Sequence, residues 1–178
     1  MSRKILVISA SPRRGGKLDV LCDALEAGAR EAGKEVAALN INDWNIHPCT
    51  GCDACQENEG RCIQEDDMKQ VLDALCRAEA VVFATPIYFY NMAGQMKVFL
   101  DRTYPLRRNA HFRKAALLAA SCEGDESVFD TAVSGFEEYL RCFPDVENAG
   151  SVLAGGVCAS CALPEKAVEG ARVLGREM

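Results

Sequence analysis

Four cysteines lie close together in the first third of the chain, at a spacing that suits a metal centre. Two residues separate Cys49 from Cys52 and Cys52 from Cys55, and Cys62 follows after six more. Gaps of two residues let successive thiolates converge on one small object, and a fourth sulfur after a longer gap completes a four-coordinate set. A [4Fe–4S] cluster and a zinc ion need the same thiolates, so spacing does not separate them. Thiols without a metal, empty or redox-active, are the third alternative.

A second candidate site is the segment from Ser9 to Lys17, which reads Ser-Ala-Ser-Pro-Arg-Arg-Gly-Gly-Lys. It joins an apolar run to a helical pattern, and the free N–H groups and dipole of a helix N-terminus attract anions. A hydroxyl, a guanidinium and two glycines that permit close backbone approach complete a phosphate-binding loop; the alternative is an ordinary polar surface loop. The residues expected to form this site are Ser9, Ser11, Pro12, Arg13, Gly15, Gly16 and Lys17.

Two common nucleotide-binding motifs do not fit the sequence. Aligning Gly16 and Lys17 with a P-loop places Ser11 where that motif requires glycine and Leu18 where it requires a hydroxyl. No G-x-G-x-x-G follows any predicted strand, so a tightly bound dinucleotide is not indicated. A mononucleotide suits the loop better.

An aromatic segment follows the third predicted strand and is the candidate for binding a flat ring. Its three aromatic residues lie beside backbone polar groups, where a heteroaromatic ring can stack, although core or subunit-interface packing is an equal alternative. A third loop follows the fourth predicted strand. The candidate residues of these two loops are Thr85, Pro86, Ile87, Tyr88, Phe89, Tyr90 and Asn91, and Ser121, Glu123 and Gly124.

Apolar runs that alternate with helical patterns are expected to position these loops. Strands are predicted at residues 4–9, 35–41, 80–85, 115–120 and 152–156, and helices at 17–32, 66–78, 92–103, 127–142 and from Pro164. This order predicts an α/β fold with a parallel sheet covered on both faces, in which ligands bind beyond the carboxyl ends of the strands. The cysteine-rich stretch 42–64 has no clear periodicity, and so long a connection is usually functional.

The composition predicts one ordinary globular domain over residues 1–178. The chain is 49% hydrophobic and 26% charged, which permits a sizeable core. Its net charge of −6 disfavours a nucleic acid partner. No apolar run approaches a membrane span or a signal-peptide core, so we expect a cytoplasmic protein. In that reducing compartment the ten cysteines favour metal or redox chemistry over disulfides.

Three segments together resemble one known family. Ser11-Pro-Arg-x-Gly-Gly16, Pro86-Ile-Tyr-Phe89 and Gly94-Gln-Met-Lys-x-Phe-Leu-Asp-Arg102 are similar to the NADPH-dependent FMN reductases and iron-sulfur flavoproteins of the flavodoxin-like superfamily. The resemblance is specific over residues 5–104. It implies a flavodoxin-like three-layer sandwich with a five-stranded parallel sheet of order 2-1-3-4-5, noncovalent FMN, and a homodimer or homotetramer.

The resemblance also assigns residues. It implies that the phosphate is contacted by Ser11, Arg13 and the amides of Gly15 and Gly16, and the flavin ring by Pro86, Ile87, Tyr88, Phe89 and Asn91. The spacing of Cys49, Cys52, Cys55 and Cys62 resembles the [4Fe–4S] motif of iron-sulfur flavoproteins. One departure concerns Lys17 and Leu18, where family members often have Asn-Thr. Lys17 either replaces the lost hydroxyl with a charge-assisted hydrogen bond or points to solvent and leaves FMN binding weaker.

The predicted function is an FMN-dependent NAD(P)H oxidoreductase. Electrons pass from a transiently bound nicotinamide nucleotide through FMN to a small-molecule or protein acceptor, such as a quinone, a flavin or an iron-sulfur centre. FMN carries the chemistry, so no catalytic side chain is expected, and His47 and His111 are interpreted as surface or structural residues. Asp101 and Arg102 are interpreted as part of a structural ion pair at a helix end.

Two alternative functions use the same residues. One is an iron-sulfur flavoprotein that carries electrons without turning over a substrate of its own. The other is a thiol-metal interaction module with a vacant flavin site.

The remaining cysteines are given little functional weight. Cys22, Cys76 and Cys142 fall in predicted helices and are expected to be small core residues. Cys158 and Cys161 have a C-x-x-C spacing, but they follow the last strand, away from the position that thioredoxin-like chemistry needs.

Overall fold

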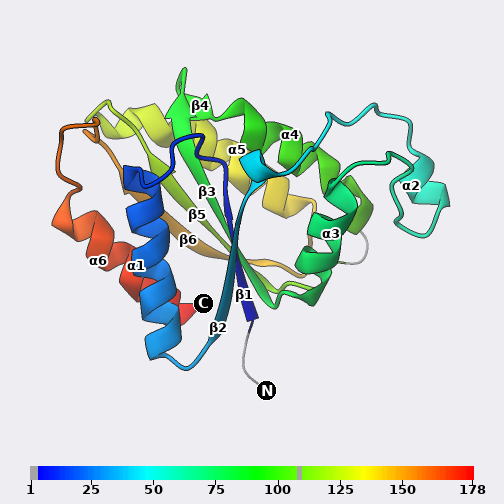
Figure 1. The fold of residues 1–178 in the computed structure, drawn as a ribbon, viewed down its shortest axis with the longest axis horizontal. Helices are drawn as coiled ribbons and strands as arrows, with labels where there is room; N and C mark the ends of the chain where they lie inside the picture. The colour runs from blue at the N-terminus through cyan, green and yellow to red at the C-terminus, as the bar shows by residue number, and fades with distance from the viewer. Residues whose placement is uncertain (1–3, 108–109) are drawn as a thin grey trace.

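The computed structural model describes residues 4–107 and 110–178 and has a central, mainly parallel sheet (Figure 1). Five strands run parallel in the order β2-β1-β3-β5-β6, and the short β4 pairs antiparallel with β3. The strands are β1 (Lys4–Ser9), β2 (Glu35–Asn40), β3 (Ala80–Tyr88), β4 (Asn91–Met92), β5 (Lys114–Ala120) and β6 (Glu147–Ala154).

Helices cover both faces of this sheet, as an apolar parallel sheet requires. In Figure 1, α1 and α6 lie side by side over one face, and α3, α4 and α5 lie over the other. Alternate residues of β1 divide between the two cores: Ile5 and Val7 face α1 and α6, and Leu6 and Ile8 face the opposite layer. The helices are α1 (Lys17–Glu31), α2 (Ala54–Glu57), α3 (Met68–Arg77), α4 (Gly94–Arg102), α5 (Asp130–Arg141) and α6 (Glu165–Glu177), with short 3-10 turns η1 (Ile41–Asp43), η2 (Tyr104–Leu106) and η3 (Glu126–Phe129).

The prediction of five strands was one short, and the end of β3 was placed wrongly. β3 continues through Pro86 to Tyr88, with Pro86 in register with Ala120 of β5. The pairing of β1 with β3 has already ended at Ser9 and Ala84, so this part of β3 has no β1 partner on that side, and a proline is tolerated there. The sixth strand, β4, folds back on the end of β3.

β6 begins earlier than predicted, at Glu147 rather than Val152. Its first residues include Glu147, Asn148 and Gly150, which gave no apolar run. As an edge strand β6 keeps one side exposed, so its residues do not need to be apolar.

The sheet order creates a crevice at its carboxyl edge. The chain winds from β1 through α1 to β2 on one side, and then crosses to β3 on the other side of β1. The connections after β1 and β3 therefore diverge, and such a point is where ligands bind in open α/β sheets. No helix in the described parts of the chain is both long and apolar enough to cross a bilayer.

Candidate functional site

A cavity of about 350 Å³ lies at this crevice, and we call it the switch-point cavity. It joins the start of α1 to the end of β3 and to the loops that follow β5 and β6. Two sequence segments predicted to bind one ligand thus form one site. The predicted residues that line it are Ser11, Arg13, Gly15, Gly16, Lys17, Pro86, Ile87 and Tyr88.

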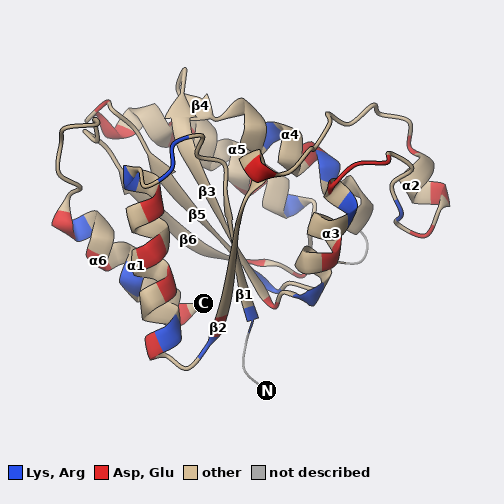
Figure 2. Ribbon diagram, viewed as in Figure 1, with Lys and Arg blue, Asp and Glu red and all other residues tan. Residues whose placement is uncertain are grey.

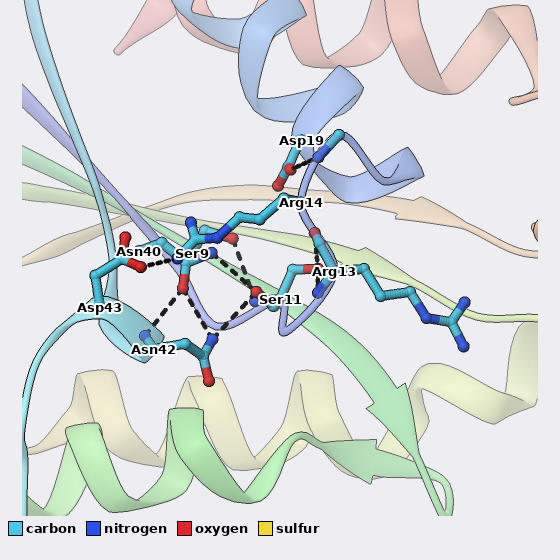
Figure 3. A network of polar contacts seen from close by, with 9 residues as sticks. Ser9, Ser11, Arg13, Arg14, Asp19, Asn40, Asn42 and Asp43 are labelled. Carbon is cyan, nitrogen blue, oxygen red and sulfur yellow. Dashed lines mark hydrogen bonds and ion pairs between the residues drawn. The ribbon is translucent and has the colours of Figure 1, made fainter.

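The loop between β1 and α1 is held in shape by its own hydrogen bonds (Figure 3). The Ser11 hydroxyl donates to the carbonyl of Arg13 at 3.1 Å and accepts from the Arg13 N–H at 3.3 Å. Gly15 has a φ of +62°, a left-handed conformation that favours glycine. Gly16 is the N-cap residue of α1 and makes no side-chain cap, so the first N–H groups of the helix remain available to an anion.

Two asparagines, one at the end of β2 and one in η1, fix this loop from the side, and neither was predicted from the sequence. The Ser11 carbonyl accepts hydrogen bonds from the side-chain amides of Asn40, at 2.8 Å, and Asn42, at 3.1 Å (Figure 3). No sequence motif marks these two asparagines, because they reach the Ser11 carbonyl only when β1 and β2 are paired. The asparagines therefore position the predicted phosphate loop rather than the ligand.

The two arginines of the loop have different roles. Arg14 forms an ion pair with Asp43, whereas Arg13 extends away from that pair (Figure 3). Figure 2 shows part of this loop, immediately before α1, in the blue that marks Lys and Arg. Arg13 is thus the guanidinium more available to a phosphate, and Lys17 lines the same cavity.

A carboxylate in the first turn of α1 opposes anion binding. The Gly15 N–H donates to Oδ2 of Asp19 at 2.7 Å, so one backbone donor of the loop is already engaged. Asp19 stabilises the N-terminus of the helix, but it also places a negative charge beside the proposed phosphate position. Asp19 was not among the site residues predicted from the sequence.

The aromatic segment divides into a part that lines the cavity and a part that projects from it. Phe89 and Tyr90 are 101% and 62% exposed, and both have positive φ, at 50° and 62°. Non-glycine residues in this conformation are strained, and they form the turn between β3 and β4. Thr85 is fully buried, and its hydroxyl accepts from the Ala93 N–H at 3.0 Å, which joins the end of β3 to the start of α4.

The predicted residues after β5 shape the cavity without lining it. The Ser121 carbonyl accepts from the Val157 N–H at 2.8 Å, and the Glu123 carbonyl accepts from the Gly156 N–H at 2.7 Å. Nine predicted residues lie outside the cavity lining: Ser9, Pro12, Thr85, Phe89, Tyr90, Asn91, Ser121, Glu123 and Gly124. Lining residues that were not predicted are Arg14, Leu18, Val20, Ala120, Cys122, Val157, Cys158 and Ala159.

The four motif cysteines line a separate cavity of about 550 Å³, which we call the cysteine cavity. Cys49, Cys52, Cys55 and Cys62 all contribute to its wall, although no three Cys, His, Asp or Glu side chains of the described residues are placed to hold a metal ion. The pKa of Cys52 is lowered, first by a hydrogen bond from the backbone N–H of the residue two positions later and then by the side chain of Thr50. A lowered pKa favours the thiolate, which metals require.

A buried ion pair fastens the cysteine loop to α4. Arg102 donates to both carboxylate oxygens of Asp66, at 2.5 and 2.8 Å, to the His47 carbonyl at 2.6 Å, and to the Cys62 sulfur at 3.7 Å. Arg102 and Asp66 are both buried, whereas Asp101 pairs with Lys97. The predicted structural ion pair of Arg102 is therefore made with a distant residue rather than with its neighbour.

The remaining cysteines differ in part from expectation. Cys22 is buried, and burial raises its pKa to about 12, as suits an inert core residue. Cys142 is exposed, so its prediction as a core residue was wrong. Cys158 and Cys161 form a disulfide, which the predicted preference for reduced thiols did not anticipate.

The fold and this site define a flavodoxin-like α/β protein. Known structures share the arrangement over almost the whole chain. An NAD(P)H:quinone oxidoreductase from Methanothermobacter marburgensis matches with a TM-score of 0.71 and 17% identity, covering 99% of this chain and 95% of the other. An azoreductase from Bacillus anthracis matches with a TM-score of 0.70 and 18% identity, covering 99% and 100%.

Sequence comparison places the protein more narrowly. Residues 3–137 match the NADPH-dependent FMN reductases, and the chain belongs to that family. An iron-sulfur flavoprotein of Methanocaldococcus jannaschii is 33% identical over 138 residues, which cover 75% of this chain and 70% of the relative. One from Archaeoglobus fulgidus is 36% identical over 102 residues, covering 57% of this chain but only 46% of that protein. Membership implies FMN as cofactor and NAD(P)H as its reductant.

The charge of Asp19 leads to a prediction about FMN affinity. Asp19→Asn keeps the shape of the side chain but removes a negative charge near the phosphate loop, so the Kd for FMN is expected to fall several-fold. Isothermal titration of the apoprotein measures this. Riboflavin, which lacks the phosphate, is the control and is expected to bind both proteins equally. An unchanged Kd for FMN would show that Asp19 does not face the phosphate.

The Asp66–Arg102 pair predicts a pH-dependent stability. Hydrogen bonds from Arg102, the leading cause, lower the pKa of Asp66 from 3.8 to about 2, so its contribution is full above pH 4 and is lost as the pH falls toward 2. Asp66→Asn is expected to cost about 3 to 5 kcal/mol at pH 7, because it leaves a buried charge unpaired. Urea unfolding from pH 7 to pH 2 measures the difference, which is expected to shrink below pH 4; a constant difference would refute the assignment.

Proposed function

We propose that the protein is an FMN-dependent NAD(P)H oxidoreductase whose flavin occupies the switch-point cavity. The observation that carries this proposal is the joining, in one cavity, of the α1 N-terminus and the segment Pro86–Tyr88. The acceptor is proposed to be a quinone, a flavin or an iron-sulfur centre. FMN supplies the two-electron chemistry when bound, and the chain binds and orients it.

The residues fit the two ends of FMN. At one end, the Ser11 loop offers the first amides of α1, the glycines and the Arg13 guanidinium, all of which suit a dianionic phosphate. At the other end, Pro86 and Tyr88 offer apolar and aromatic surface for a flat ring. Tyr88 is 41% exposed, so this side of the cavity is open to a transiently bound nicotinamide.

The test is reconstitution followed by turnover. Apoprotein loaded with FMN is expected to oxidise NADH or NADPH when a quinone is supplied, and Arg13→Gln is expected to raise the Kd for FMN about tenfold by removing a charge-assisted hydrogen bond. Arg14→Gln is the matched control. Its side chain is held by Asp43 in an exposed ion pair, so a much smaller change is expected.

The outcomes separate the alternatives. Bound FMN with negligible NAD(P)H oxidation for any acceptor would favour an electron carrier. Colourless protein that takes up no FMN would leave only the thiol-metal module.

We further propose that Cys49, Cys52, Cys55 and Cys62 hold a [4Fe–4S] cluster that serves as a one-electron centre. All four thiols line the cysteine cavity, the pKa of Cys52 is already lowered, and Arg102 fastens the loop through Asp66. A cluster needs the four sulfurs to move closer together, because the described residues show no preformed site of three such ligands.

Anaerobic purification tests the cluster. About four irons per chain and a broad visible absorbance are expected for the unmodified protein, and Cys52→Ser is expected to lose most of both. Cys142→Ser is the control, because Cys142 lines the same cavity but lies outside the motif. Zinc in place of iron, or no metal at all, would refute the cluster.

Three further expectations rest on the same reasoning and stay predictions. They are a single domain over residues 1–178, a homodimer or homotetramer, and a cytoplasmic location. The exposed side chains of Phe89 and Tyr90 supply apolar surface for a partner subunit.

A further inference from the structure

The disulfide between Cys158 and Cys161 lies in the loop from β6 to α6, beside the proposed flavin site. Cys158 and Ala159 line the switch-point cavity together with Ser11 and Tyr88. The four motif cysteines line the cysteine cavity instead, and the two cavities share no lining residue among those described. The disulfide, rather than the cysteine loop, therefore shares a wall with the flavin site.

Neighbouring residues hold the backbone next to Cys158 in place at the cavity. The N–H of Val157, the residue before Cys158, donates to the Ser121 carbonyl at 2.8 Å. The Cys122 thiol, which also lines the cavity, donates to the Val157 carbonyl at 3.5 Å. The loop that follows β5 thus fixes the position of Cys158.

The bridge is poorly suited to a purely structural role. Disulfides stabilise a fold chiefly by closing large loops in the unfolded chain, and this one joins residues only three apart. The C-x-x-C spacing is instead common in redox-active pairs. The Ser160 hydroxyl donates to the Cys158 sulfur at 3.3 Å, and such a bond favours the thiolate that forms when a disulfide opens.

We propose that Cys158–Cys161 is a redox-active disulfide that accepts an electron pair through the flavin. The proposal rests on the proposed function, which supplies NAD(P)H as reductant. NAD(P)H gives up a hydride, solvent supplies one proton, and the S–S bond breaks. The products are NAD(P)⁺ and the two thiols of Cys158 and Cys161, so each chain stores two electrons beyond those held by FMN.

The experiment counts thiols and electrons in the FMN-loaded protein. Oxidised protein with one equivalent of FMN is reduced anaerobically by light with EDTA as electron donor, then alkylated and analysed by peptide mass spectrometry. Alkylation of Cys158 and Cys161 is expected to exceed that of an illuminated sample without FMN at least tenfold. The exposed thiol Cys142 is expected to be alkylated in both samples and serves as the internal reference.

Two variants sharpen the count. Cys161→Ser is expected to take up one two-electron equivalent fewer per chain than the unmodified protein. Cys142→Ser removes an exposed thiol that does not line the switch-point cavity and leaves the bridge intact, so no loss is expected.

Each outcome decides between the two proposals. A bleached flavin with Cys158 and Cys161 still protected from alkylation would overturn this inference and leave the proposed function standing, as would free thiols at both positions before reduction. If FMN does not bind, both proposals fail. A parallel dark sample receives NADPH or NADH in place of light. Reduction of the bridge by light but not by the nucleotide would support the disulfide as an acceptor of flavin electrons and refute the nucleotide's part in both proposals.

Discussion

The parallel pairing of β1 with β3 is the constraint on which the candidate site depends. Both strands are almost entirely apolar and buried, so they occupy the middle of the sheet, and their pairing ends at Ser9 and Ala84. The Ala10 N–H adds one further bond to the Ala84 carbonyl, at 2.8 Å. Because the two connections leave this point in different directions, the phosphate loop and the aromatic segment form the two sides of one cavity.

The charges around the switch-point cavity have both signs, although Asp19 does not line the cavity itself. The helix N-terminus, Arg13 and Lys17 attract a phosphate, whereas Asp19 repels it and occupies the Gly15 N–H. In a chain with a net charge of −6, local geometry has to supply the attraction. Because Asp19 accepts from the Gly15 N–H and adds a negative charge there, we expect it to weaken the binding of FMN.

Eight of the ten cysteines fall into two groups with separate positions. One group lines the cysteine cavity beside the end of α4, where Arg102 fastens the loop. The other group, Cys122, Cys158 and Cys161, lies at the carboxyl ends of β5 and β6 beside the switch-point cavity. Because the two groups are separate, we propose different redox roles for them: a cluster in the cysteine cavity and a redox-active disulfide beside the switch-point cavity.

The sequence predicted the elements that depend on local pattern. Apolar runs and helical spacing located the five parallel strands and the five longer helices, because burial on both faces dictates those patterns. β4 was missed because its turn uses Phe89 and Tyr90 in positive φ, where glycine or asparagine is the usual signal.

The site residues that were not predicted from the sequence depend on contacts between segments that are distant along the chain. Asn40 and Asn42 act on the Ser11 carbonyl only after β1 and β2 have paired. Cys158 reaches the cavity only because β6 lies beside β5 and the loops beyond them are joined by hydrogen bonds. Residue spacing along the sequence does not predict such contacts.

The most direct measurement of the central claim is a crystal structure of the protein with FMN bound. We expect density for the phosphate at the first amides of α1, within hydrogen-bond distance of Ser11 or Arg13, and density for the ring against Pro86 and Tyr88. Density for FMN elsewhere, for example in the cysteine cavity, would contradict the account.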